Sequence, residues 1–274
     1  MRTVLTIAGS DSSGGAGVQA DLKTFAALGV YGACALTAVT AQSTTGVIAS
    51  EPLSADMVTA QIEAVAGDIG IHATKTGMLA TAAVIEAVVA AIQELELPLV
   101  VVDPVMVSTS GQRLLDIDGV QALRRELLPL ARVVTPNVPE AEALSGQRIA
   151  SAADVRDAAR RIRDMGPKAV IVTGGHPFDQ ANGPKREGSP RDVVDLLLDG
   201  EAFHELRTAR VDMPKTHGTG CTFAAALAAH LAHARPLAHA AEQAQRYVAG
   251  AIAHGLAIGR GQRLLNHFWQ TAKT

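Results

Sequence analysis

Residues 216–229 read THGTGCTFAAALAA, in which glycines flank a threonine and a cysteine opens an alanine-rich helical pattern. The first backbone N–H groups of a helix lack partners within the helix, and the helix dipole places partial positive charge beside them. Glycines also let a backbone approach a phosphate closely. The segment therefore predicts an anion hole at a helix N-terminus, formed by Gly218, Thr219, Gly220 and Cys221.

Cys221 stands beside this predicted anion hole. Phosphoryl transfer needs positioning and charge stabilisation more than covalent help from the protein. A helix N-terminus lowers the pKa of a thiol from its usual value of about 8.5, so we expect Cys221 to accept the proton of an attacking hydroxyl. Taken alone, a cysteine at this place is more typical of a small core residue. The polar residues that follow the other strands favour a catalytic role for Cys221 instead.

Polar or glycine residues follow six of the expected strands. Ligands of open α/β sheets bind outside the carboxyl ends of the strands, so these residues are expected to meet in one crevice. They are Gly9, Ser10 and Asp11 after the first strand, then Gln42, the sequence Lys75-Thr76-Gly77, Asp103, Asn137, and Gly174 with Gly175.

Asp103 interrupts the apolar run LVVVDPVMV, where an unpaired carboxylate is costly to bury. It therefore needs a cation, a metal or a hydrogen-bond donor. Asn137 and Glu140, in TPNVPE, add oxygen atoms at the end of the next strand. Mg²⁺ typically binds one or two carboxylates together with water and substrate phosphates, so we expect Asp103, Asn137 and Glu140 to hold Mg²⁺. Taken alone, Glu140 is more typical of a solvated acid at a helix N-terminus.

The glycine-rich turn GSDSSGGAG, residues 9–17, indicates that backbone approaches a small substrate closely. It is not a Walker A loop, because Val18 stands where the lysine would follow the last glycine. It also lacks the full dinucleotide-binding pattern, and a tight turn between a strand and a helix is the alternative. Asp21 lies four residues after Gly17, where its side chain is expected to point back into the pocket.

The elements expected to position these residues alternate between short β-branched runs and longer helical patterns. We expect strands at 3–8, 32–42, 47–53, 72–78, 99–107, 132–137 and 169–175, and helices at about 15–28, 55–69, 82–95, 219–233 and 237–257. Asp199-Gly200 predicts a β-hairpin within 193–211, and the polar loop 176–191 is interpreted as an insertion. This pattern predicts one α/β domain over 1–274: a three-layer sandwich whose mostly parallel sheet has helices on both faces and a small β-hairpin or flap.

The composition argues against several classes of protein. The chain of 274 residues has a formal net charge of −3 and a pI near 6.3, which give no reason to expect nucleic acid or an anionic membrane as a partner. Two cysteines make no disulfide framework, and no apolar run approaches the roughly 18 residues of a membrane helix. The N-terminal apolar run is too short for a signal peptide. We expect a soluble, cytoplasmic protein.

Several separated motifs together point to a known family. They are LTIAGSDSSGGAGVQADLKTFAALGVYG, KTGML, DPVMVSTSG, TPNVPEAEAL, GGH and THGTGCTFAAALAAHLA, in that order between about residues 3 and 257, with NHF at 266–268. In these motifs the chain resembles the hydroxymethylpyrimidine/phosphomethylpyrimidine kinases of thiamine biosynthesis, in the ribokinase-like superfamily. The resemblance implies phosphorylation of 4-amino-5-hydroxymethyl-2-methylpyrimidine, and then of its monophosphate, with ATP and Mg²⁺. It also implies a ribokinase-like fold and usually a homodimer.

The resemblance further implies roles for single residues. The residues expected around the pyrimidine are Gly9, Asp21, Gln42, Met78 and Val105. Those expected on the ATP side are Lys75, Asn137, Thr173 and Gly174. Those expected to organise metal and phosphates are Asp103, Asn137 and Glu140, while Gly218 to Cys221 form the anion hole. Gln42 suits the edge of an aminopyrimidine because its amide both donates and accepts hydrogen bonds.

Two positions depart from the family pattern. Where these kinases often have Lys-Gly-Gly-His, the chain has Thr173-Gly174-Gly175-His176, and Gln245 stands where a lysine is common near the last helix. Both departures are expected on the nucleotide side, with Lys75 or Arg246 as candidates to supply the charge. Three alternatives stay open: a vitamin B6 kinase of the same fold, a catalytically silent pyrimidine-binding sensor and, more weakly, a Rossmann dehydrogenase. AQST with Gln42, and STSG after DPVMV, favour the pyrimidine kinase.

Overall fold

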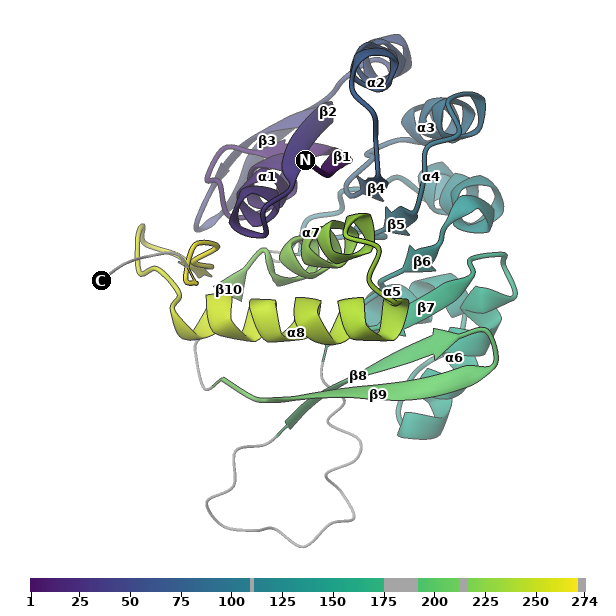
Figure 1. Cartoon of the computed structure of the whole chain (residues 1–274), viewed down its shortest axis with the longest axis vertical. Helices are drawn as coiled ribbons and strands as arrows, with labels where there is room; N and C mark the ends of the chain where they lie inside the picture. Colours follow the sequence, from purple (N-terminus) through teal and green to yellow (C-terminus); the bar gives the residue numbers. More distant parts are fainter. Residues whose placement is uncertain (109–110, 175–191, 212–215, 271–274) are drawn as a thin grey trace, which may run out of the picture.

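A computed structural model describes residues 1–108, 111–174, 192–211 and 216–270. Within these residues a nine-stranded sheet forms the middle layer, in the order β3-β2-β1-β4-β5-β6-β7-β8-β9 (Figure 1). Its strands are β1 (Thr3–Asp11), β2 (Tyr31–Ser43), β3 (Gly46–Pro52), β4 (Ala73–Thr76), β5 (Val100–Val102), β6 (Val133–Val134), β7 (Ala169–Val172), β8 (Asp192–Asp199) and β9 (Ala202–Ala209).

The central strands β2, β1, β4, β5, β6 and β7 run parallel, whereas β3, β8 and β9 pair antiparallel at the two edges. β5 and β6 consist of valine alone because both of their faces are buried. The predicted hairpin is confirmed: β8 ends at Asp199, which pairs with Ala202 of β9, and Gly200 and Glu201 join the strands, with φ +58° at the glycine. β5 and β6 are shorter than expected because Pro104 and Pro136, which follow them, have no N–H to donate to the sheet.

Helices cover both faces of the sheet, as the sequence predicts (Figure 1). One face carries α1 (Gly17–Ala27), α7 (Thr219–Ala232) and α8 (Leu237–Ala253). The other carries α2 (Ala55–Asp68), α3 (Ala82–Glu94), α4 (Ile117–Ala122), α5 (Val138–Ser145) and α6 (Ala152–Arg163). A π-helical turn (Leu123–Leu127) and a 3₁₀ turn (Leu128–Leu130) follow α4. The predicted insertion at 176–191, together with Gly175, lies outside the described residues.

Helix α7 packs against the sheet, α1 and α8, and its sequence explains how it fits there. The alanines between Ala224 and Ala229, together with Leu227, are fully buried. Alanine has the highest helix propensity, and its small side chain lets neighbouring elements approach closely. The alanine-rich sequence therefore allows the N-terminus of α7 to reach the carboxyl edge of the parallel strands.

A second, two-stranded sheet ties the C-terminal segment to the start of α7. Strand β10 (Thr216–His217) pairs in parallel with β11 (Arg263–Leu264). In Figure 1 the yellow C-terminal segment lies beside β10. The sequence does not predict this sheet, because two-residue strands carry no readable period.

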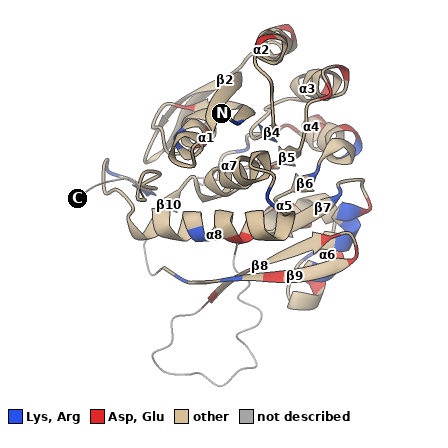
Figure 2. Ribbon diagram, viewed as in Figure 1, with Lys and Arg blue, Asp and Glu red and all other residues tan. Residues whose placement is uncertain are grey.

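Charged residues lie mainly on the outer helices and on the β8–β9 hairpin, with both signs mixed (Figure 2). Arg156 of α6 pairs with Glu205 of β9, and Arg163 pairs with Glu201 in the hairpin turn. Among the described residues, no helix is both long enough and apolar enough to cross a lipid bilayer.

Lys75 is an exception to this outer distribution, because its side chain is completely buried at the carboxyl edge of the sheet. Its Nζ lies 2.9 Å from Oδ2 of Asp21 on α1 and 3.9 Å from Oδ2 of Asp103, which follows β5. Thr6 Oγ1 also donates to Asp21 Oδ2, at 2.6 Å. Burying three charges is tolerable only because they compensate one another. One lysine thus links α1, β4 and the end of β5.

Replacing this lysine is expected to destabilise the whole domain. Lys75→Met removes the cation but leaves two buried carboxyl groups, so the free energy of unfolding should fall by about 3–5 kcal/mol in a denaturant titration. The double variant Lys75→Met/Asp21→Asn removes one of those charges and should recover part of the loss. A single variant as stable as the parent protein would show that the domain does not depend on the ion pair.

Candidate active site

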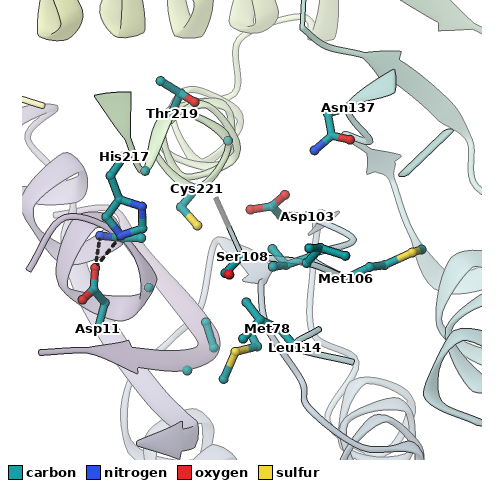
Figure 3. Close-up of a pocket in the computed structure, with 18 of the residues that line it drawn as sticks. Asp11, Met78, Asp103, Met106, Ser108, Leu114, Asn137, His217, Thr219 and Cys221 are labelled. Atoms are coloured by element: carbon teal, nitrogen blue, oxygen red, sulfur yellow. Dashed lines mark hydrogen bonds and ion pairs between the residues drawn. The ribbon is translucent and has the colours of Figure 1, made fainter. Parts of the chain in front are cut away.

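A cavity of about 500 Å³ opens at the carboxyl ends of the parallel strands (Figure 3). Among the residues that the structure describes, Asp21 and Gly174 do not line it, although the sequence places them in the site. A volume of this size is typical of small-molecule sites. The structure thus brings most of the predicted site residues to one place. Those that line the cavity are Gly9, Gln42, Lys75, Met78, Asp103, Val105, Asn137, Glu140, Thr173 and the four residues Gly218 to Cys221.

The predicted anion hole falls at a glycine that caps the start of a helix. Gly218 is the N-cap of α7 with φ +91°, and a Cβ there would collide with the carbonyl oxygen of Gly15. Helix α7 begins at Thr219, so the N–H groups of its first residues have no partners within the helix. Those residues line the cavity, and they therefore offer the predicted row of donors to an anion.

The glycine-rich turn after β1 is held by Asp11, to which the sequence assigns no separate role. Its carboxylate accepts hydrogen bonds from the backbone N–H groups of Ser13 and Ala16, each at 2.8 Å, and lies 2.9 Å from Nε2 of His217. Burial acts to raise the pKa of Asp11, but the hydrogen bonds from His217 and Ser13 outweigh it and lower the pKa to about 2. Asp11 thus ties the glycine-rich turn to the residue before the anion hole, a contact drawn in Figure 3.

His217 is a neighbour of the site that the sequence analysis missed. It lines the cavity and also lies 3.0 Å from Nε2 of Gln42, one of the predicted pyrimidine contacts. Its sequence signal is its place directly before Gly218. Its partners on β1 and β2 are 206 and 175 residues away, and no local pattern predicts such contacts.

Cys221 lies where the sequence predicts, but the expectation of a lowered thiol pKa is wrong. Burial raises the pKa of the Cys221 thiol to about 12, and the nearby charge of Lys75 opposes this shift without cancelling it. The thiol is therefore protonated near neutral pH. The neighbouring charge of Asp103 adds to the rise in the pKa of this thiol.

Asp103 and Glu140 are buried carboxyl groups that line the same cavity. Burial raises the pKa of Asp103 to about 6, although Lys75 opposes the shift. Burial raises the pKa of Glu140 to about 8, and the charge of Asp103 adds to the shift. Asp103 Oδ2 has no hydrogen-bond partner among the described residues. Both pKa values are raised because the two carboxyl groups are buried, and a divalent cation would stabilise their ionised forms. These residues therefore fit Mg²⁺ that also binds phosphate oxygens.

Asn137 has a structural role beside this pair. Its side chain accepts the N–H of Glu140 at 2.9 Å, while Glu140 Oε2 accepts the N–H of Asn137 at 3.0 Å, which together form a capping box at the start of α5. Within the described ranges, no group of three or more His, Cys, Asp or Glu side chains is placed to hold a metal ion. A cation here would therefore depend on ligand oxygens as well as on Asp103 and Glu140.

Most of the residues expected around the pyrimidine line the cavity. Gly9, Gln42, Met78 and Val105 line the cavity, and a Cβ on Gly9 would lie 2.6 Å from the Met78 methyl group. The glycine therefore leaves room for the methionine in the wall. Asp21 is fully buried and bonded to Lys75, so it acts on the cavity through the lysine.

Thr173 and Gln245, the two departures from the family pattern, are both expected on the nucleotide side, and the structure differs from this expectation at Gln245. Thr173 lines the cavity, but Gln245 is buried, and its Nε2 donates to Asp195 Oδ2 at 2.8 Å. Asp195 in turn accepts the N–H of Gly174 at 3.1 Å. Gln245 thus reaches the end of β7 through Asp195. Arg246 is exposed and is not one of the described residues that line the cavity.

The chain is similar in sequence to known proteins over nearly its whole length. The family model described as phosphomethylpyrimidine kinase matches residues 11–266. The hydroxymethylpyrimidine/phosphomethylpyrimidine kinase of Synechococcus elongatus is 48% identical over 265 residues, which cover 97% of this chain and 97% of that relative. The bifunctional thiamine biosynthesis protein of Geobacter sulfurreducens is 46% identical over 97% of this chain, which spans 52% of that longer relative.

Solved structures resemble the fold over nearly its whole length. A pyridoxal kinase from Staphylococcus aureus, in complex with AMP-PCP and pyridoxal, superposes with a TM-score of 0.86 at 38% identity, covering 99% of this chain and 95% of the other. A phosphomethylpyrimidine kinase from Clostridium difficile superposes with a TM-score of 0.77 at 38% identity, covering 90% of this chain and 98% of the other.

The ionisation of Cys221 can be measured directly. In a Cys34→Ala variant only Cys221 remains, and we expect its thiolate absorbance and its alkylation rate to stay low up to about pH 9, because its pKa is raised to about 12. The double variant Cys34→Ala/Cys221→Ser supplies the background signal. A titration with a midpoint below about 8.5 would instead support the lowered pKa that a helix N-terminus alone predicts.

Proposed function

The chain belongs to the phosphomethylpyrimidine kinase family and has a ribokinase-like fold, and from this premise we propose how its own site works. The protein transfers a phosphoryl group from ATP to the hydroxymethyl group of 4-amino-5-hydroxymethyl-2-methylpyrimidine, and then phosphorylates the monophosphate, in thiamine biosynthesis. One observation carries the proposal: the first residues of α7 line the same cavity as Asp103, Gly9 and Met78.

The transferring phosphoryl group is bound mainly by backbone. Its equatorial oxygens accept hydrogen bonds from the first N–H groups of α7, where the helix dipole adds partial positive charge. Lys75 lines the same cavity and keeps its proton: burial alone would lower its pKa, but the charge of Asp21 raises it above the ordinary value. The substrate ring lies against Gly9, Met78 and Val105.

Mg²⁺ belongs to this proposal as a partner of ATP. Asp103 and Glu140 would hold it, and it would supply positive charge against the phosphate oxygens of the nucleotide. With that cation present, both carboxyl groups would ionise at lower pH than they do in the free protein. Asn137 keeps Glu140 in place through the capping box.

The proton of the attacking hydroxyl needs an acceptor. A protonated thiol accepts a proton only if it gives up its own, and Asp103, which lines the same cavity, offers a carboxylate oxygen without a hydrogen-bond partner among the described residues. We therefore assign Cys221 the role of a relay. As the hydroxyl oxygen bonds to the γ-phosphorus and the bond to ADP breaks, the hydroxyl proton passes to the sulfur and the thiol proton passes to Asp103.

A relay predicts a graded response to substitution at Cys221. Cys221→Ser keeps a group that both accepts and donates a proton, so kcat should fall by less than about tenfold, whereas Cys221→Ala should lower kcat by roughly 10²–10⁴-fold with little change in KM. Steady-state kinetics at neutral pH separates the two variants. Equal and large losses in both would point to a thiolate base, and near-normal turnover by the alanine variant would remove Cys221 from the chemistry.

The substrate assignment is tested by an ADP-release assay. The hydroxymethylpyrimidine and pyridoxal are offered side by side with Mg-ATP, and we expect a much higher kcat/KM for the pyrimidine, with activity lost on chelation and restored by added Mg²⁺. Pyridoxal is the second candidate, because a pyridoxal kinase shares the fold over nearly the whole chain. A preference for pyridoxal would overturn the main assignment, and binding of the pyrimidine without turnover would indicate a silent sensor.

We also propose a homodimer, a cytoplasmic location and a single kinase domain over 1–274. The dimer rests on the edge of the sheet, where Ile48 of β3 is 81% exposed and Val39 of β2 is 47% exposed. The location rests on two free cysteines, which suit a reducing compartment. Sedimentation equilibrium should show a dimer for the parent protein and more monomer for Ile48→Asp. Cell fractionation would test the cytoplasmic location. A single cooperative unfolding transition would test the single domain.

A further inference from the structure

We propose that His267, in the C-terminal segment, is a positioning residue that holds the anion hole in shape through the hydroxyl group of Thr222. This inference rests on the proposed function, because it concerns the N–H groups that bind the transferring phosphoryl group. His267 belongs to the segment NHF, 266–268, to which the site described above assigns no role.

The contact is a chain of two hydrogen bonds. Thr222 Oγ1 lies 2.8 Å from the carbonyl oxygen of Gly218 and 3.1 Å from Nε2 of His267. A carbonyl oxygen only accepts, so the single hydrogen of the hydroxyl group must point at Gly218. The hydroxyl oxygen is then the acceptor for His267, whose Nε2 must carry a hydrogen. This order fixes the direction of both bonds.

The backbone of the segment that carries His267 is held against α8. The His267 side chain is buried, and burial lowers its pKa to about 4, so the ring is neutral near neutral pH. The Tyr247 hydroxyl donates to the His267 carbonyl, and the Asn266 N–H donates to the Ala251 carbonyl at 3.1 Å. Tyr247 and Ala251 both belong to α8. Helix α8 thus supports the first turn of α7 through the segment that carries His267.

The peptide group between Gly218 and Thr219 is what this support holds. In a planar trans peptide the carbonyl oxygen and the following N–H point in opposite directions. The Gly218 carbonyl accepts the Thr222 N–H at 3.0 Å as well as the Thr222 hydroxyl, so it is held inside the first turn of α7. The Thr219 N–H must then point the other way, out of the helix end, where it can donate to an anion.

The peptide group between Gly218 and Thr219 is free to rotate unless hydrogen bonds hold it, because the residues around it restrict it little. Gly218 has φ +91°, no side chain of the described residues caps the helix there, and glycine rotates more freely than any other residue. A rotation of the peptide would turn the Thr219 N–H away from the anion and place a carbonyl oxygen near the phosphate. A second hydrogen bond to the carbonyl, itself backed by His267, opposes that rotation.

Four variants separate positioning from simple structural support. His267→Leu and Thr222→Val remove the chain of hydrogen bonds, while His267→Gln and Thr222→Ser keep a donor and a hydroxyl at the same places. Trp269→Phe is the matched control, because it removes the bond from Trp269 Nε1 to the Tyr247 carbonyl and so loosens the same segment without breaking the contact with Thr222. Each variant is assayed for kcat and KM with the pyrimidine and for amide hydrogen exchange at Thr222 by NMR.

We expect His267→Leu and Thr222→Val to lower kcat by roughly 10- to 100-fold with KM for the pyrimidine nearly unchanged. The double variant should be no worse than the poorer single variant, because both break one chain of bonds. His267→Gln and Thr222→Ser should recover most of the activity, and Thr222 amide exchange should quicken in the two disruptive variants but not in Trp269→Phe.

Two results would overturn the proposal. One is a kcat for His267→Leu within about twofold of the parent protein. The other is equal loss of activity and of amide protection in Trp269→Phe, which would mean that the segment acts only as a structural support. The exchange measurement does not need turnover. If the parent protein proved inactive on the pyrimidine, the proposed function would fail, while the exchange pattern would still decide the role of His267.

Discussion

The buried cation of Lys75 is the constraint on which the rest of the site depends. It lies between Asp21 and Asp103, and all three side chains are almost completely buried, so removal of one partner leaves a buried charge without compensation. The packing of α1 against the sheet and the reach of the chain beyond β5 must therefore bring two carboxyl groups to one lysine. The same charge also keeps the pKa of Asp103 lower than burial alone would set it, so stability and chemistry share one interaction.

Around this ion pair the site is shaped mostly by backbone. Gly17 and Gly218 have positive φ, and a Cβ on either would collide with a backbone carbonyl oxygen, that of Gly9 in β1 for the first and that of Gly15 in the glycine-rich turn for the second. The glycine-rich turn and the start of α7 therefore interlock, with Asp11 joining them from the side. Backbone donors need no particular side chains, so a phosphate-binding surface of this kind tolerates changes among the side chains around it.

The sequence predicts best what local pattern and strand order determine. The helix that begins after Gly218, the buried carboxylate of Asp103 and the β8–β9 hairpin follow from motif, period and turn chemistry, and the structure contains them. It predicts least what distance in the chain and burial determine. The pKa of Cys221 depends on enclosure that no motif records, and His267 meets Thr222 across 45 residues through a C-terminal segment without a recognisable period.

The two departures from the family pattern are not equivalent. The Gln245 amide donates to a β8 carboxylate and to a β9 carbonyl, so this residue holds the hairpin against α8. Thr173 does line the cavity, but its hydroxyl carries no charge to a phosphate. In the proposed mechanism, positive charge for the phosphoryl group would then come from Lys75, a bound cation and the dipole of α7. A site that relies on a helix dipole in place of a lysine depends on the direction of each terminal N–H. The orientation of the peptide after Gly218 therefore matters more here than it would beside a lysine at position 173.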